Sequence, residues 1–349
     1  MSDAKACIRP DDLQTALSSL NPQADAGTQL HEILKQGLDQ IPLPGSGATL
    51  KRWQALATVA AHNLSLVKLY EGHTDARAIL AELDDTGAPV ATTCGVAWGV
   101  WAAESANTRV IITPQAGRVV RLDGTKCWCS GAQTVSHGLL TAWHADGRGP
   151  QLVRVAMHQP GVSVSEAAWA AVGMADSASV DVTFAAADAH LVGELGDYLS
   201  RPGFWQGGAG IAACWYGGAM GLGTALHDML AESLPAARGA FRLVALGKVD
   251  VALHRTAALL RDTAQWIDDH PLEDASSVAL RVRLAAEDCA KTVLDEAGRA
   301  LGASAFCRNA RFARAAADLP VFVRQSHGER DFVSLAERVI PIGGPSWAL

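Results

Sequence analysis

The chain has 349 residues, of which 49% are hydrophobic and 19% are charged, a composition typical of a globular protein with a substantial core. Its formal net charge is −7 at pH 7 and no basic stripe is present, which argues against nucleic-acid binding. No run of about 18 apolar residues occurs, so we expect no membrane span. Met1–Pro10 lacks the apolar segment of a secretory signal.

The cysteines indicate a reduced, cytoplasmic protein. There are seven of them, an odd number, and they are scattered along the chain. Cys127 and Cys129 form a Cys-x-Cys pair, but no second cluster with metal-ligand spacing accompanies them. We therefore predict no metal site.

Residues 1–90 carry apolar side chains at helical spacing, which favours a helical domain packed by these stripes. One helix is expected to begin near Pro10 and a second to include Leu30–Leu38. A third is expected over Trp53–Tyr70 and a shorter fourth over Ala76–Leu83.

The apolar period changes over residues 91–195, where short runs rich in β-branched residues alternate with segments rich in Gly, Asp, Pro and Ser. This pattern predicts a small antiparallel β-domain. The runs are Val110–Thr113, Arg118–Arg121, Gly138–Trp143, Gln151–Met157 and Val180–Phe184.

Residues 196–349 return to helical spacing, with long amphipathic helices expected over Ala240–His270 and Ser276–Leu301. Glycines recur between Gly207 and Gly221 inside one Ala-rich helical run. Because glycine costs a helix about 1 kcal/mol relative to alanine, these glycines indicate the close approach of a second helix or of a ligand. We favour helix packing.

The stretch Gly124–Ala132 places a tryptophan, Trp128, two positions before a hydroxyl residue, Ser130. Side chains alternate along a strand, so both are expected on one face. A flat ring beside a hydroxyl suits a hydrogen-bonding heterocycle such as a flavin. The alternative is an ordinary β-turn with a core tryptophan.

Lys126, Trp128 and Ser130 match the Lys, Trp and Thr of a segment written G-x-K-x-W-I-T-N, so the stretch resembles the flavin-facing segment of acyl-CoA dehydrogenases. Further similar stretches follow in the family's order. They are Gly173–Ser179, Gly207–Leu226 and Arg324–Asp331.

The resemblance implies a mostly α fold with a central β-domain. N-terminal helices (1–90), a β-barrel-like middle domain (91–195) and a C-terminal four-helix bundle (196–349) are expected. It also implies FAD-dependent α,β-dehydrogenation of an acyl-CoA thioester or a related small molecule, as in fatty acid metabolism. An electron-transfer acceptor and a homodimer or homotetramer accompany that activity.

Cofactor contacts are carried over from the resemblance position by position. Trp128 is expected to pack at the flavin ring and Ser130 to bind its polar edge. Glu104 and Ser105 fall on the family's T-E-P segment, although Ala103 replaces its Thr. In the segment that resembles the family's diphosphate site, the candidates are Arg299 and Gly302, while the family's Arg-x-x-Phe-Gly signature is absent.

The catalytic carboxylate of the family has no match, because Ile211 stands at one of its two positions and Asp318 lies about one position from the other. His327 and Glu329 are candidate bases in its place. We favour His327, since neutral imidazole accepts a proton near pH 7. The alternative is that both lie on a solvated helix.

Two other functions stay open. A flavin-dependent monooxygenase of the same fold needs no base at an α-carbon, which agrees with the missing carboxylate. A catalytically degenerate subunit or binding protein is the non-enzymatic alternative.

Overall fold

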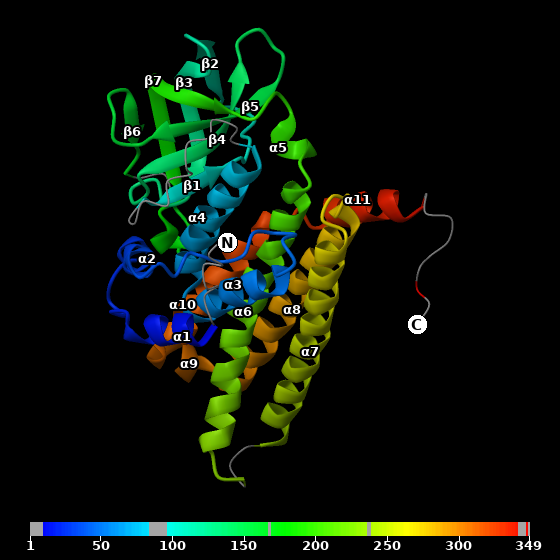
Figure 1. The fold of residues 1–349 in the computed structure, drawn as a ribbon. Helices are drawn as coiled ribbons and strands as arrows, with labels where there is room; N and C mark the ends of the chain where they lie inside the picture. The colour runs from blue at the N-terminus through cyan, green and yellow to red at the C-terminus, as the bar shows by residue number, and fades with distance from the viewer. Residues whose placement is uncertain (1–9, 84–95, 167–168, 236–238, 341–346, 348–349) are drawn as a thin grey trace, which may run out of the picture. The chain divides into compact units, whose positions relative to one another are not determined.

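The computed structural model describes residues 10–83, 96–166, 169–235, 239–340 and 347 (Figure 1). The chain folds as two compact units. Unit 1 comprises the described residues of Met1–Ile41, Ser65–Ala171 and Ala175–Phe204. Unit 2 comprises those of Pro42–Leu64, Val172–Met174 and Trp205–Leu349.

The helices before the sheet are α1 (Pro10–Ser19), α2 (Ala26–Lys35), α3 (Thr49–His62) and α4 (Leu64–Leu83). The single helix expected over Trp53–Tyr70 is wrong, because Asn63 adopts extended backbone (φ −159°, ψ 123°) and ends α3. The short helix expected over Ala76–Leu83 is the second half of α4.

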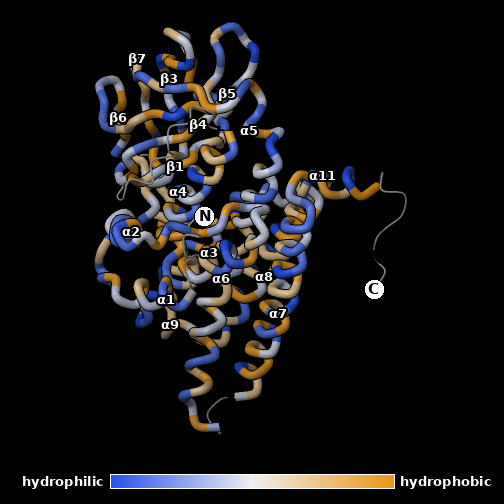
Figure 2. Tube along the Cα trace, viewed as in Figure 1, coloured by the Kyte–Doolittle hydropathy of each residue, from blue (hydrophilic) through white to orange (hydrophobic). Residues whose placement is uncertain are grey.

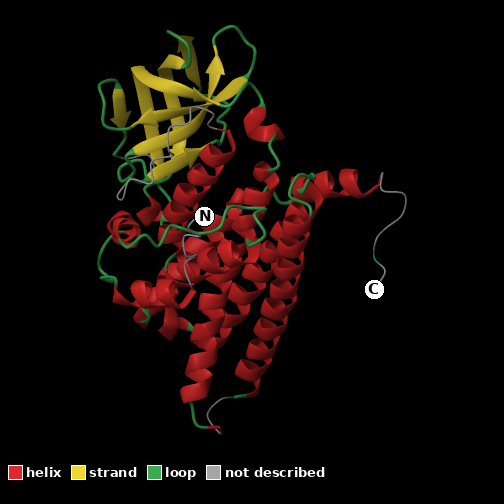
Figure 3. Cartoon of the chain, in the orientation of Figure 1, coloured by secondary structure: helices red, strands yellow, loops and turns green. Residues whose placement is uncertain are grey.

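The strands of unit 1 form one seven-stranded sheet (yellow in Figure 3). The hydrogen-bonded path runs β4-β2-β3-β7-β5 and returns to β4, so the sheet closes on itself as a barrel. The strands are β1 (Trp98–Trp101), β2 (Val110–Pro114), β3 (Val119–Cys129), β4 (His137–His144), β5 (Pro150–Ala156), β6 (Val162–Val164) and β7 (Val180–Val192).

The expectation of a purely antiparallel domain is wrong, because β1 and β2 both pair with β4 in parallel. The β2–β3 hairpin reverses the chain, and the connection from β3 into β4 reverses it again, which restores the direction of β1 and β2. Burial alternates along β3, where Val120 and Leu122 are buried and Arg121 and Asp123 are exposed. The hydropathy colouring of Figure 2 shows hydrophobic and hydrophilic stretches intermixed along the strands of the sheet.

Helix α4 covers part of the sheet. Its residues Ala76, Ile79 and Leu80 pack in one core cluster with Trp98 of β1 and Leu139 of β4. This packing buries the beginning of β1, which leads on to the loop that carries Glu104.

Unit 2 is helical, and its two longest predicted helices are confirmed: Ala240–His270 appears as α7 (Ala240–Asp269) and Ser276–Leu301 as α8 (Ser276–Leu301). The other helices after the sheet are α5 (Asp197–Ser200), α6 (Gly203–Glu232), α9 (Ala303–Arg308), α10 (Ala310–Phe322) and α11 (Glu329–Val339). Short 3-10 turns occur at Ala175–Ser177 and Val323–Gln325.

The α6 glycines permit close helix packing. A Cβ at Gly217 would lie 2.3 Å from the carbonyl oxygen of Ala57 on α3, and one at Gly223 would lie 2.9 Å from Val249 Cγ1 on α7. These contacts favour helix packing as the reason for the repeated glycines. Within the described ranges, no helix combines the length and apolar character that crossing a bilayer requires.

Candidate functional site

Trp128 lies in a β-bulge at the end of β3, where the pairing with β7 shifts register between Lys126 and Cys129. Its φ is 59°, a left-handed conformation that costs a bulky residue about 1–3 kcal/mol. The residue is nevertheless 52% exposed. Backbone strain that holds a large ring at the surface is typical of a functional position.

The alternation argument for Trp128 and Ser130 does not hold. Strand β3 ends at Cys129, so Ser130 belongs to the following turn, and the positive φ at Trp128 interrupts the pleat. The Ser130 backbone N–H donates to the Trp128 carbonyl at 3.0 Å. Chain turning, rather than strand alternation, therefore sets the directions of these two side chains.

Contacts from other segments hold the Ser130 turn in place. Trp101 Nε1 donates to the Ser130 carbonyl at 3.0 Å, and the Gly131 N–H donates to the Ser177 carbonyl at 2.8 Å. The Ser130 and Ser179 hydroxyls are 2.7 Å apart, and Ser179 Oγ lies 2.9 Å from Ser177 Oγ. The turn is thus clamped by β1 and by the segment before β7.

Glu104 accepts hydrogen bonds from several protein donors. Lys126, only 4% exposed, donates from Nζ to Glu104 Oε1 at 2.8 Å and also to the Thr141 hydroxyl. The Thr141 hydroxyl donates to Glu104 Oε1, and Trp143 Nε1 donates to Oε2 at 3.0 Å. The carboxylate therefore ties the loop after β1 to β3 and β4.

Two opposing effects act on the pKa of Glu104. Burial raises the pKa, but the hydrogen bonds from Lys126, Thr141 and Trp143 and the positive charge of Lys126 outweigh it, so the pKa lies below its usual range. The carboxylate is ionised and paired at neutral pH. Its direct contact with a cofactor stays a prediction.

The other predicted cofactor residues make local contacts. The Ser105 hydroxyl accepts the backbone N–H of Asn107 at 3.3 Å. Arg299 on α8 forms ion pairs with Asp295 and, at 3.0 Å, with Glu296. Gly302 (φ 65°) joins α8 to α9, and a Cβ there would meet no atom within 4 Å. Arg299 and Gly302 thus lie three positions apart in unit 2, whereas Ser105 belongs to unit 1.

The two candidate bases lie beside each other at the beginning of α11, in unit 2. The His327 side chain is 69% exposed, and its Nδ1 lies 3.3 Å from Asp331 Oδ1. The His327 backbone N–H donates to the buried Asp331 carboxylate at 3.1 Å. Glu329 is the exposed first residue of the helix. Their catalytic roles stay predictions.

Asp318 on α10 is a buried carboxylate with a structural partner. It is 4% exposed, and its Oδ1 accepts the Met174 backbone N–H at 2.6 Å. Met174 has a φ of 58°, and a Cβ at the preceding Gly173 would lie 2.1 Å from the Ala317 carbonyl oxygen. The carboxylate thus holds a strained segment against α10.

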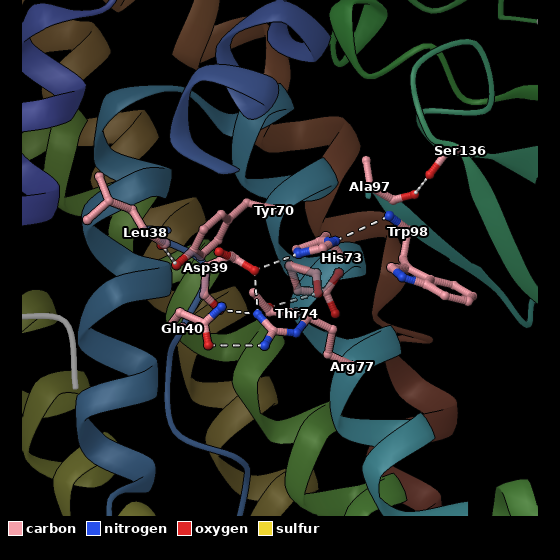
Figure 4. Close-up of polar contacts among 11 residues, drawn as sticks. Leu38, Asp39, Gln40, Tyr70, His73, Thr74, Arg77, Ala97, Trp98 and Ser136 are labelled. Atoms are coloured by element: carbon pink, nitrogen blue, oxygen red, sulfur yellow. Dashed lines mark hydrogen bonds and ion pairs between the residues drawn. The ribbon is translucent and has the colours of Figure 1, made fainter. Parts of the chain in front are cut away.

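Sequence reasoning missed a buried polar cluster in unit 1 (Figure 4). His73 Nδ1 accepts the Trp98 backbone N–H at 3.2 Å, which leaves the ring hydrogen on Nε2 to be donated to Asp39 Oδ2 at 3.1 Å. Arg77 also donates to Asp39 and, at 3.2 Å, to Gln40. The four-residue spacing of His73 and Arg77 indicates that they share one face of a helix. Nothing in the sequence indicates that Asp39, 34 residues before His73, is their partner.

Burial lowers the pKa of His73 and outweighs the opposite effect of Asp39. Burial alone would raise the pKa of Asp39, but the hydrogen bond from His73 and the charge of Arg77 lower it overall. The arrangement is a neutral imidazole beside an Arg–Asp ion pair, which fixes the α2–α3 connection to α4. Among the described residues, no three His, Cys, Asp or Glu side chains gather as metal ligands.

No protein-family model matches the chain, and no curated protein matches it either. Solved structures do match. TdsC from Paenibacillus sp. A11-2, in complex with FMN and indole, is 18% identical with a TM-score of 0.78, and the match covers 97% of each chain. Another structure of TdsC describes it as a dibenzothiophene monooxygenase.

Two further matches also cover most of both chains. KijD3 in complex with FMN and a dTDP-linked amino sugar is 15% identical, with a TM-score of 0.77 over 97% of this chain and 92% of that chain. Butyryl-CoA dehydrogenase from Megasphaera elsdenii is 14% identical, with a TM-score of 0.80 over 97% of this chain and 100% of that chain. The predicted fold is confirmed: the chain is a divergent protein with the acyl-CoA dehydrogenase fold.

Proposed function

We propose that the protein is a flavin-dependent oxidoreductase acting on a small organic molecule, with Trp128 and Ser130 as flavin contacts. The single observation that carries the proposal is the strained, clamped turn that exposes Trp128. TdsC and KijD3, which share this fold, are seen in complex with FMN. Because Trp128 is half exposed, packing in the protein core does not explain its positive φ.

The residues at this turn suit a flavin. An exposed indole offers a flat face for an isoalloxazine ring. The Ser130 hydroxyl has one donor and two acceptor positions, and Ser179 Oγ occupies one of them, so capacity for a cofactor hydrogen bond is left. A bound flavin would supply the redox chemistry itself, while the protein binds it, orients it and positions the substrate.

FAD differs from FMN by an adenosine monophosphate, which completes a diphosphate, and Arg299 and Gly302 are the candidates to hold this arm. The charge of Arg299 is balanced by Asp295 and Glu296. This pairing favours FMN, as in the TdsC and KijD3 complexes. If the resemblance extends to the diphosphate site, the cofactor is FAD.

Oxygen-dependent chemistry is the reaction that the contacts favour. Dehydrogenation needs a base beside the thioester, and the carboxylate closest to the family's position, Asp318, is engaged with the Met174 backbone. Ile211 occupies the alternative position. A monooxygenase needs no such base.

Acyl-CoA dehydrogenation is the second candidate, favoured by the match to the full length of butyryl-CoA dehydrogenase. In that case His327 or Glu329 would accept the α-proton, and an electron-transfer acceptor would reoxidise the cofactor. We propose a homo-oligomer for either reaction. Its proposed interface is the apolar face of α7 formed by Phe241, Val244 and Val251, all of which are exposed.

The test begins with the absorbance spectrum of the purified protein, with FMN or FAD added where none co-purifies. Anaerobic bleaching by an acyl-CoA thioester supports dehydrogenation. Oxygenation is supported if the flavin is reduced chemically and the reduced protein then consumes oxygen only when an aromatic substrate is added. A protein that neither carries nor binds a flavin contradicts the proposal and leaves the degenerate binding protein.

A further inference from the structure

Unit 1 contains a cavity of about 390 Å³ that none of the Trp128-turn residues lines. Its volume lies at the small end of the range of about 300–1,000 Å³ found for small-molecule sites. The side chains that matter for its chemistry are Trp98, His137, Arg154, Asp188, His190 and Leu80.

The sheet register places these side chains on one face. Trp98 pairs with His137, and His137 pairs with Ala156, which forms one row across β1, β4 and β5. Arg154 lies two positions before Ala156 and pairs with His190 of β7 in the adjacent row. Residues two apart on a strand share a face, so the fold itself gathers the aromatic and the basic groups.

One wall of the cavity is aromatic. The Trp98 and His137 rings stack with their centroids 4.7 Å apart at an interplanar angle of 29°. The Trp98 indole N–H is buried and, among the described residues, has no hydrogen-bond acceptor. An unsatisfied buried donor costs free energy, which a ligand acceptor can recover. Leu80 adds an apolar surface.

Groups that can donate hydrogen bonds to an anion line the cavity. They are the Arg154 guanidinium and two imidazoles, while the lining carboxylate of Asp188 lies 3.4 Å from the Arg121 guanidinium. Burial lowers the pKa of His137, and the positive charges of Arg154 and His158 lower it further. The His137 ring thus experiences a positive potential that a carboxylate would offset.

We propose that this cavity binds a small aromatic carboxylate, whose ring lies against the Trp98–His137 wall and whose carboxylate faces Arg154 and His190. The ring uses the stacked, apolar side of the cavity, and the charged group uses the basic side. The proposal does not depend on flavin binding, because the lining residues belong to β1, β4, β5, β7 and their surroundings in unit 1 alone.

The test is calorimetric titration of the purified full-length protein with benzoate and with benzamide, its neutral counterpart of similar shape. We expect benzoate to bind with a dissociation constant of about 0.1–1 mM and benzamide at least about tenfold more weakly. Absence of benzoate binding up to about 10 mM, or equal binding of benzamide, overturns the proposal.

Variants then locate the site. Ala156→Trp introduces a large ring from an exposed lining position and is expected to abolish binding, while Arg154→Gln weakens it about tenfold or more. Arg148→Gln makes the same charge change at an exposed turn of the same sheet and leaves binding intact. Thermal melts verify folding. Loss of benzoate binding in Trp128→Ala, with retention in Ala156→Trp, assigns benzoate to the Trp128 turn and overturns the proposal.

Discussion

The ammonium group of Lys126 lies 2.8 Å from the carboxylate of Glu104, in a part of unit 1 where the lysine is almost fully buried. A buried charge requires its partner, since removing one member leaves the other desolvated and unpaired. This pair joins the loop after β1 to the strand that ends at Cys129, next to Trp128.

Replacing Glu104 tests that dependence. Because Glu104 is partly exposed, we expect Glu104→Gln to lower the free energy of unfolding by about 1–3 kcal/mol, less than a fully buried pair would. Glu194→Gln breaks a more exposed pair with Arg118, in the segments just before β3 and just after β7, and should cost less than about 1 kcal/mol. Urea denaturation measures both, and equal losses would contradict the special role of Glu104.

The same pair predicts a pH dependence. The pKa of Glu104 is lower in the folded chain than its ordinary value of 4.5, so its stabilising contribution is complete above that value and is lost as the pH falls through the folded pKa. Wild type should therefore lose more stability than Glu104→Gln on acidification below about pH 4.5. If the free energy of unfolding falls equally in the two proteins from neutral to acid pH, this prediction is wrong.

Substitutions of Asp318 distinguish a structural role of its carboxylate from a catalytic one. Asparagine retains an oxygen that can accept the Met174 N–H, so Asp318→Asn should keep most of the stability and all of the activity. Asp318→Ala leaves the buried N–H unpaired and should cost about 1–3 kcal/mol. If Asp318→Asn folds normally but loses flavin reduction by substrate, Asp318 is the base and the structural assignment is wrong.

Trp128 permits a test of strain at the proposed flavin site. Trp128→Gly removes the penalty of the positive φ, so we expect equal or greater stability, by up to about 1 kcal/mol, together with weaker flavin binding. Ala186→Gly relieves a similar φ of 53° on β7 and should leave flavin affinity unchanged. Unchanged flavin affinity in Trp128→Gly would remove Trp128 from the cofactor site.

His327 matters only if the reaction is dehydrogenation. His327→Ala should then slow flavin reduction by about 10²-fold or more while flavin stays bound. Glu329→Gln is the matched test of the neighbouring candidate. Stopped-flow bleaching at the visible absorbance maximum of the flavin gives the rate for each variant. Wild-type rates in both would place the base elsewhere.

The exposed face of α7 predicts self-association. Phe241 is 92% exposed, and Phe241→Asp combined with Val251→Asp should shift the protein toward monomers in light scattering. Arg148→Asp, at an exposed turn between β4 and β5 in unit 1, makes the same change of two charge units outside α7 and is the control for added negative charge. A wild-type monomer at micromolar concentration would contradict the proposed oligomer.

Local pattern determined much of the secondary structure. Helix period and length predicted α7 and α8, because each presents an apolar stripe over many turns. Alternating β-rich runs located β2, β4, β5 and the beginning of β7. The order of motif-like stretches, rather than any one of them, indicated the acyl-CoA dehydrogenase fold.

The tertiary structure decided what depends on contacts between distant residues. The parallel pairing of β1 with β4, the bulge at Trp128 and the engagement of Asp318 with Met174 each join segments far apart in the chain. Sequence spacing names the residue types, but it does not determine which partner satisfies a buried charge or where a strand loses its pleat. Those outcomes follow from the packing of the whole unit, since a buried polar group is bonded to whatever the fold brings within reach.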